Sequence, residues 1–99
     1  MSPACGYSIY LLRCRDGSIY TGITTDVARR LAEHKDGARG AKYLRGKGPF
    51  ELIYQREVGS RSVASRLEHR IKQLSPQDKQ NARILPARIA LLMDEIGAQ

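Results

Sequence analysis

Hydrophobic and β-branched residues are concentrated in three short segments of the chain. The segments at 7–14 ("YSIYLLRC"), 18–24 ("SIYTGIT") and 51–58 ("ELIYQREV") are rich in aliphatic and aromatic side chains. Such segments are typical of strands. The "RDG" between the first two is a turn signal, so we predict that they form a hairpin.

Two polar segments with apolar residues at helical spacing lie on either side of the third predicted strand. In segment 24–37, Thr25 or Asp26 can cap a helix that ends at Gly37. Segment 59–74 predicts a second helix, with Ser60 or Ser62 as its cap and an apolar stripe of Val63, Leu67, Ile71 and Leu74.

The last quarter of the chain carries two further sets of helix signals. Segment 75–84 predicts a third helix, with Ser75 at the cap and Pro76 at the first helical position. A last helix is expected after Pro86, ending near Gly97. The order ββαβα plus one or two helices predicts an α+β fold, in which helices flank a small three-stranded antiparallel sheet. We expect a single domain over 1–99.

The length of the hairpin loop decides whether Tyr10 and Tyr20 share a face of the sheet, because side chains alternate along a strand. A two-residue loop would place them on opposite faces. A three-residue loop, 15–17, pairs position 12 with 20 and position 10 with 22, which places both tyrosines on one face. We prefer this register because Gly17 then occupies the left-handed position that such loops need. One face would carry Ile9, Leu11, Ile19 and Ile23, with Arg13, and the other Tyr10, Leu12, Cys14, Ser18, Tyr20 and Gly22.

The composition is that of a globular, basic protein. The 99 residues are 41% hydrophobic and 27% charged, with a net charge of +7. No apolar run reaches the length of a membrane span, and the first residues lack signal-peptide features. We therefore expect a soluble, cytoplasmic protein with no membrane partner. Cys5 and Cys14 have neither metal-ligand spacing nor a disulfide framework around them.

The positive charge favours a polyanionic partner, since lysines and arginines gain by releasing phosphate counterions. Its densest cluster lies in the glycine-rich segment 39–47, "RGAKYLRGK". This segment can be an ordinary solvated loop. It can also contact nucleic-acid phosphates while the tyrosine stacks on a base. The candidate binding residues are Arg39, Lys42, Tyr43, Arg45 and Lys47.

Four polar residues on the helices are further candidates. Arg30 and His34 are four residues apart and share a helix face, and Glu68 flanks the apolar stripe of the second helix. Each also has an ordinary explanation. Arg30 and His34 can pair with Glu33 or Asp26, and Glu68 with Arg61, Arg66 or Lys72. Asn81 can be a simple helix or capping residue.

The ordered set of these residues resembles the GIY-YIG nuclease superfamily. The matching features are "SIY", then "YTG", then Arg30, His34, Glu68 and Asn81. The pattern "YTGITTDVARRLAEHKDG…GAKYLRG…RLEHRIKQLS" is similar to the small single-domain bacterial members, the UPF0213-like group. The resemblance covers about residues 5–83 and leaves 84–99 as a C-terminal helical extension.

The resemblance implies a GIY-YIG endonuclease-like fold and hydrolysis of a nucleic-acid phosphodiester, with one Mg²⁺ or Mn²⁺ as cofactor. DNA, branched or single-stranded, is the expected substrate, and a role in repair or recombination would follow. The alternative is a nucleic-acid-binding module of the same fold with little or no catalysis. A homodimer or a protein partner could add to substrate recognition, because we expect a single domain without a second DNA-binding domain.

The resemblance also implies a role for each matching residue. Tyr20 would activate the attacking water, as general base or through a metal-bound hydroxide, and Tyr10 would orient that water. Arg30 would stabilise the phosphate in the transition state, and His34 would assist proton transfer or bind phosphate. The expected metal ligand is Glu68, and Asn81 is expected near the phosphate or the leaving group.

The sequence departs from the family pattern at three positions. Ser8 replaces the glycine of the first motif and Thr21 the isoleucine of the second, and both replacements suit a strand. Ile23 stands where repair-type members carry a lysine, so one electrostatic partner of Tyr20 is missing. A tyrosine near its ordinary pKa of about 10 is a poor base at neutral pH. It therefore needs a cation, which Arg30 and a metal ion could supply.

Overall fold

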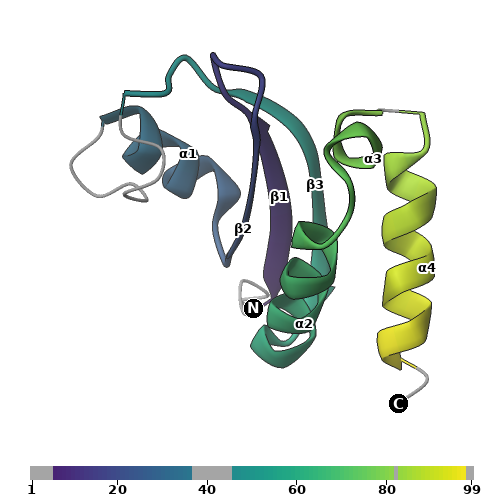
Figure 1. Ribbon diagram of the computed structural model, residues 1–99. Helices are drawn as coiled ribbons and strands as arrows, with labels where there is room; N and C mark the ends of the chain where they lie inside the picture. Colours follow the sequence, from purple (N-terminus) through teal and green to yellow (C-terminus); the bar gives the residue numbers. More distant parts are fainter. Residues whose placement is uncertain (1–5, 37–45, 82, 98–99) are drawn as a thin grey trace.

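The computed structural model describes residues 6–36, 46–81 and 83–97, which form an α+β fold (Figure 1). Its elements are strands β1 (Tyr7–Arg13), β2 (Ile19–Thr24) and β3 (Glu51–Gly59), and helices α1 (Val27–Asp36), α2 (Arg61–Lys72), α3 (Pro76–Gln80) and α4 (Leu85–Gly97). The predicted fold class is confirmed. No helix in the described part of the chain is long and apolar enough to cross a membrane.

The three strands form an antiparallel sheet in the order β2-β1-β3, so β2 and β3 are its edges. In the hairpin, Tyr10 pairs with Gly22 and Leu12 with Tyr20, which confirms the three-residue loop. The Gly17 amide donates to the Cys14 carbonyl (2.9 Å), and Gly17 has a φ of 88°. The left-handed conformation that favours glycine therefore sets the register of the hairpin.

Each face of the sheet has its own hydrophobic cluster. On one face, Ile9 and Leu11 are fully buried with Leu67 and Ile71 of α2 and with the apolar residues of α4, Leu85, Ile89 and Ile96. On the other face, Tyr10, Leu12 and Cys14 pack with residues of α1, Val27 and Leu31. Helix α1 therefore covers one face of the sheet, and α2 and α4 cover the other, as Figure 1 shows.

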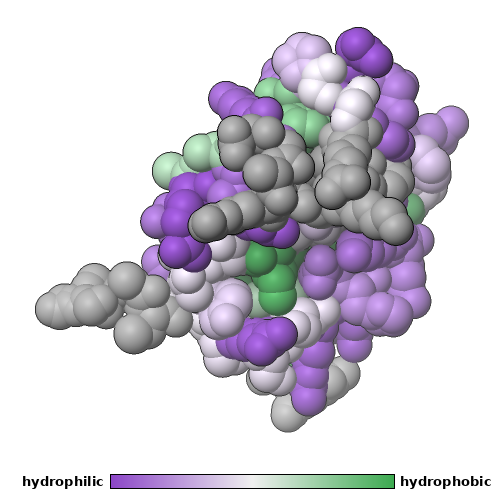
Figure 2. Space-filling view, turned by 90° about the vertical axis from the view of Figure 1, so that its left-hand side faces the viewer, coloured by the Kyte–Doolittle hydropathy of each residue, from purple (hydrophilic) through white to green (hydrophobic). Residues whose placement is uncertain are grey.

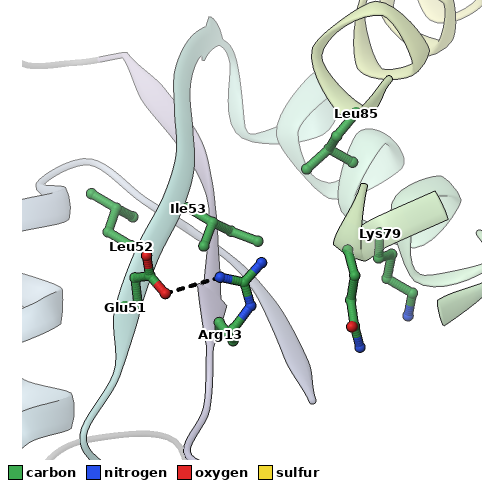
Figure 3. Close-up of a pocket in the computed structure, with 7 residues that line it drawn as sticks. Arg13, Glu51, Leu52, Ile53, Lys79 and Leu85 are labelled. Carbon is green, nitrogen blue, oxygen red and sulfur yellow. Dashed lines mark hydrogen bonds and ion pairs between the residues drawn. The ribbon is translucent and has the colours of Figure 1, made fainter. Parts of the chain in front are cut away.

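Arg13 is the polar exception on the face of Ile9 and Leu11, and an ion pair explains it. Its cross-strand neighbour is Glu51, and Arg13 Nη1 lies 2.9 Å from Glu51 Oε1. Figure 3 shows this pair beside Ile53, opposite Lys79 of α3 and Leu85 of α4. The pair sits at the end of the strands, where both side chains reach solvent, so the charge on this face is not buried.

Side-chain caps begin three of the four helices. Asp26 Oδ1 accepts from the Arg29 amide (3.0 Å), Ser60 Oγ from the Val63 amide (3.2 Å) and Ser75 Oγ from the Asp78 amide (3.1 Å). These contacts select Asp26 and Ser60 among the predicted alternatives. The third helix is shorter than predicted, because Asn81 has an extended backbone and ends it.

Candidate active site

Two phenols and an imidazole meet on the sheet face that α1 covers. The Tyr10 and Tyr20 ring centroids are 6.2 Å apart, and the His34 ring lies 6.0 Å from Tyr10 and 5.6 Å from Tyr20. The Tyr10 hydroxyl lies 2.8 Å from His34 Nε2 in a buried hydrogen bond. The hairpin register and one turn of α1 therefore bring together three of the predicted catalytic residues.

Gly22 makes the space that Tyr10 occupies. It is the cross-strand partner of Tyr10, and a Cβ atom built on Gly22 would lie 2.5 Å from the Tyr10 hydroxyl oxygen. Real Cβ atoms do not approach so closely, so a side chain at position 22 would displace the phenol. The glycine of "YTG" thus has a packing function: it lets the ring lie over the adjacent strand and reach His34.

Burial keeps both members of the Tyr10–His34 hydrogen bond neutral. Desolvation, together with the neighbouring Tyr20, raises the pKa of Tyr10 well above its ordinary value, although Arg30 opposes the shift. Desolvation, followed by the positive charge of Arg30, lowers the pKa of His34, and Glu33 opposes this shift. In the tautomer with its proton on Nδ1, His34 accepts a hydrogen bond from Tyr10 at Nε2. Tyr10 is therefore a protonated positioning group at neutral pH.

Arg30 lies one helical turn before His34 and borders the ring cluster. Its guanidinium interacts with the Tyr10 hydroxyl, and Nη1 lies 2.8 Å from Glu33 Oε1. About 30% of its side chain is exposed, so it can be held in place and still reach a ligand. The pairing with Glu33 is the ordinary explanation that the sequence left open. In the structure, Arg30 pairs with Glu33 and also lies beside the Tyr10 hydroxyl.

Glu68 comes from an element on the face of the sheet opposite to the tyrosines. It belongs to α2, which packs against that face. Its carboxylate lies 3.3 Å from Lys72 Nζ, one helical turn later. Lys72 in turn lines a surface hollow together with Tyr20 at the open edge of β2. Glu68 is therefore related to Tyr20 through Lys72, at the edge of β2.

Asn81 has a structural role among the described residues. Its Oδ1 accepts from the Arg83 amide (3.0 Å), and its carbonyl accepts from the Ile84 and Leu85 amides (3.2 and 3.0 Å). These contacts connect α3 to the start of α4. Asn81 is the C-cap of α3, which is one of the roles predicted for it.

In the described part of the chain, potential metal ligands are not clustered. Within the residues that the structure describes, no group of three or more histidine, cysteine, aspartate or glutamate side chains could hold one. Mg²⁺ differs from zinc in needing only one or two carboxylates, with waters and substrate phosphates completing its octahedron. The partly exposed carboxylate of Glu68 fits such a site. The donor set is therefore compatible with a cation that binds together with a substrate.

Of the five predicted binding residues in the basic loop, only Lys47 lies within the described residues; Arg39, Lys42, Tyr43 and Arg45 lie outside them. Lys47 Nζ lies 3.4 Å from Asp16 Oδ2, beside the hairpin turn. There, hydrogen bonds from Ser18, followed by the charge of Lys47, lower the pKa of Asp16 to about 2. Lys47 thus contacts the hairpin turn.

Nothing in the sequence pointed to Phe50, which also packs beside the rings of the site. Its ring centroid lies 6.4 Å from that of His34, and it packs with the cluster of Tyr10, Leu12 and Cys14. It precedes the third strand and follows a proline, and neither feature predicts a contact with α1. On the α1 side of the molecule, most of the surface that is not grey is hydrophilic, with small hydrophobic areas near the centre and toward the top (Figure 2).

The fold and the site together define a class of protein: a small antiparallel sheet that presents two phenols, an imidazole and a guanidinium on one face. A family model described as the GIY-YIG catalytic domain matches residues 6–81. A UPF0213 protein of Yersinia pestis (strain Pestoides F) is 58% identical over 74 residues, which cover 75% of this chain and 77% of that relative. The chain belongs to the GIY-YIG family of nuclease domains and to its UPF0213 group.

Solved structures agree with this assignment. The solution NMR structure of a UPF0213 protein from Bacillus halodurans has 45% sequence identity and a TM-score of 0.51, covering 81% of this chain and 84% of that one. The solution NMR structure of a protein from E. faecalis has 38% identity and a TM-score of 0.56, covering 83% and 84%.

Proposed function

We propose that the protein is a divalent-metal-dependent endonuclease that hydrolyses phosphodiester bonds of nucleic acid, with DNA as substrate. The observation that carries the proposal is the ring cluster. The Tyr10 hydroxyl is hydrogen-bonded to His34 at 2.8 Å, the Tyr20 ring lies beside both, and Arg30 interacts with the Tyr10 hydroxyl. A family match over residues 6–81 supports it.

Arg30 supplies the positive charge that the reaction needs. Negative charge builds on the phosphate oxygens in the transition state, and preorganised donors stabilise it most where water is partly excluded. Arg30 is part of α1, and its ion pair with Glu33 holds the guanidinium in position before substrate binds. Fixing such a group in advance avoids the cost of ordering it during the reaction.

The two phenols have different roles in this proposal. Tyr10 stays protonated, because burial raises its pKa, and it holds His34 by its hydroxyl. Tyr20 is less buried and lines the hollow at the edge of β2, where a nucleic-acid strand can reach it. We therefore assign contact with the attacking water to Tyr20, while Tyr10 and His34 orient that phenol and the water.

Glu68 is the carboxylate that would hold Mg²⁺ or Mn²⁺, with the substrate phosphate completing the site. When bound, the cation would act as a Lewis acid that withdraws charge from the phosphate oxygens. In the free protein, Lys72 forms an ion pair with this carboxylate. Lys72 is 55% exposed, and an i,i+4 pair on a helix typically contributes only about 0.3–0.5 kcal/mol, so exchanging the lysine for a metal ion costs little.

A direct test uses purified protein with Mg²⁺ or Mn²⁺ and a panel of plasmid, forked, single-stranded and RNA substrates. Metal-dependent cleavage is expected, and Glu68→Ala should abolish it. Glu95→Ala is the matched control, because Glu95 of α4 pairs with Arg70 of α2 and not with Lys72, and it should leave cleavage unchanged.

The alternative function is a nucleic-acid-binding module without catalysis, which the positive charge also favours. Its signature would be binding that weakens with salt, together with no cleavage of any substrate in the panel.

A further inference from the structure

A surface hollow lies beside the candidate active site, at the open edge of β2. Its volume is about 260 Å³, and it is lined by Ile19, Tyr20 and Thr21 of β2 and by Lys72 of α2. Ile19 and Thr21 point to one face of the sheet and Tyr20 to the other, because neighbouring side chains alternate. The hollow therefore spans the strand edge. Its walls are an aromatic ring, an aliphatic side chain and a lysine.

A second hollow adjoins the first and continues it toward α3. It has a volume of about 190 Å³, and its lining includes Ser18, Ile19, Lys79 and Gln80. Ile19 is common to both hollows. Gln80 Nε2 donates to the Gly17 carbonyl (2.9 Å) and so fixes α3 to the hairpin turn. Both hollows lie along β2 and share Ile19; we call them together the track, with Lys72 lining the first hollow and Lys79 the second.

The lining of this track contains a hydrogen-bonding group that the fold does not use. Thr21 is 2% exposed, and among the described residues its Oγ1 is the buried side-chain atom without a hydrogen-bond partner. Burying an unpaired hydroxyl is unfavourable. Rotation about χ1 exchanges the hydroxyl and the methyl group of threonine, so the hydroxyl can become available to a molecule in the hollow.

We propose that this track binds a single-stranded segment of nucleic acid, adjacent to the phosphate that is cleaved. Lys72 and Lys79 contact successive backbone phosphates, and a base lies between them against Ile19 and the Tyr20 ring. Base–aromatic stacking is tolerant of sequence and requires an unpaired base, and each hollow is too small for a duplex. This inference rests on the proposed function, because it names the form of nucleic acid that the same site takes.

An ion pair between Lys72 and Glu68 links this track to the carboxylate that we propose as the metal ligand. In the free protein, Lys72 Nζ lies 3.3 Å from the Glu68 carboxylate. Its side chain is 55% exposed, so the ammonium can exchange a carboxylate for a phosphate at little cost. Neutralising Glu68 should therefore strengthen nucleic-acid binding through Lys72, even when no metal ion is present.

The test measures binding without cleavage. The probe is a fluorescein-labelled 12-nucleotide oligothymidine in EDTA, followed by anisotropy over a range of salt concentrations. Lys72→Gln and Lys79→Gln should each weaken binding several-fold and reduce the slope of log K against log salt by about 0.7. Arg56→Gln removes the same charge from β3, the opposite edge of the sheet, and should leave both quantities close to wild type.

Two further variants sharpen the test. Glu68→Gln should tighten binding of the oligonucleotide in EDTA, and adding Lys72→Gln should remove that gain. Equal effects of the Lys72, Lys79 and Arg56 substitutions would overturn the proposal, as would preference for a duplex of the same length. Lysine-dependent binding without cleavage would refute only the nuclease function, whereas cleavage with no lysine dependence would refute only the track.

Discussion

The Tyr10 hydroxyl is the atom around which the site is built. It is hydrogen-bonded to His34, interacts with Arg30 and Tyr20, and lies against Gly22. Each neighbour comes from a different position in the sequence, yet two simple periodicities bring them together. The alternation of a strand aligns the tyrosines, and the helical turn aligns Arg30 with His34. These contacts could be anticipated because they follow from local geometry.

Gly22→Ala should disrupt the site by pushing the Tyr10 ring away from His34. The added Cβ would lie 2.5 Å from the hydroxyl oxygen, and forced repacking of a core costs about 1–3 kcal/mol. Urea denaturation and the His34 ring NMR signals would measure both effects. Gly48→Ala is the control, because its added Cβ would make only an ordinary contact of 3.6 Å with Phe50. Equal stability of the two variants would contradict the packing role of Gly22.

The buried His34 should make stability depend on pH. Desolvation and Arg30 lower its pKa in the folded protein, so the unfolded chain binds more protons as pH falls through about 6.5. Stability should therefore be lost on acidification below that pH. His34→Gln can still accept a hydrogen bond but cannot titrate, so it should flatten the curve between pH 7 and 5. His69→Gln, on the exposed side of α2, should keep the wild-type slope.

At the scale of the elements, the hairpin turn determines the arrangement of the phenols. Its odd number of loop residues could be predicted, because Gly17 stands where a left-handed residue is needed. The position of Glu68 could not be predicted in the same way. The sequence shows the apolar stripe of α2, but it does not say which face of the sheet the stripe covers. In the structure, α2 covers the same face as α4, the face of Ile9 and Leu11.

Gly17→Ala should destabilise the hairpin through its backbone alone. The φ of Gly17 is 88°, and no atom lies within 4 Å of an added Cβ, so the cost is that of the left-handed conformation, about 1–2 kcal/mol. Gly17→Asn should lose less, because asparagine tolerates this conformation. Thermal unfolding of the three proteins measures the difference. An alanine variant as stable as wild type would show that the turn does not constrain the register.

At the scale of the whole molecule, α4 is part of the core although the family model ends at residue 81. We expected residues 84–99 to be an extension beyond the motif-bearing region. In the structure, Leu85, Ile89 and Ile96 are buried against the sheet and α2. The motif residues carry the resemblance, but they contain no information on what covers α2. The sequence could therefore predict the helix without predicting its structural importance.

Ile89→Ala should cost about 2–4 kcal/mol, because it removes a fully buried side chain from the core. Leu91→Ala is the matched control on the same helix. Leu91 is 57% exposed, and its truncation should change stability by less than about 0.5 kcal/mol. Urea midpoints give both values. If the two substitutions had equal effects, α4 would not be docked as described.

The central claim is that Tyr20 takes part in metal-dependent cleavage. Tyr20→Phe removes one hydroxyl and keeps the ring, so the measurement is its single-turnover rate of plasmid nicking with Mn²⁺. Tyr54→Phe is the control, since Tyr54 packs with the cluster on the opposite face of the sheet. We predict that Tyr20→Phe lowers the rate by at least about 100-fold, the scale of acid–base groups, while Tyr54→Phe cleaves like wild type. Nicking by Tyr20→Phe at the wild-type rate would contradict the account.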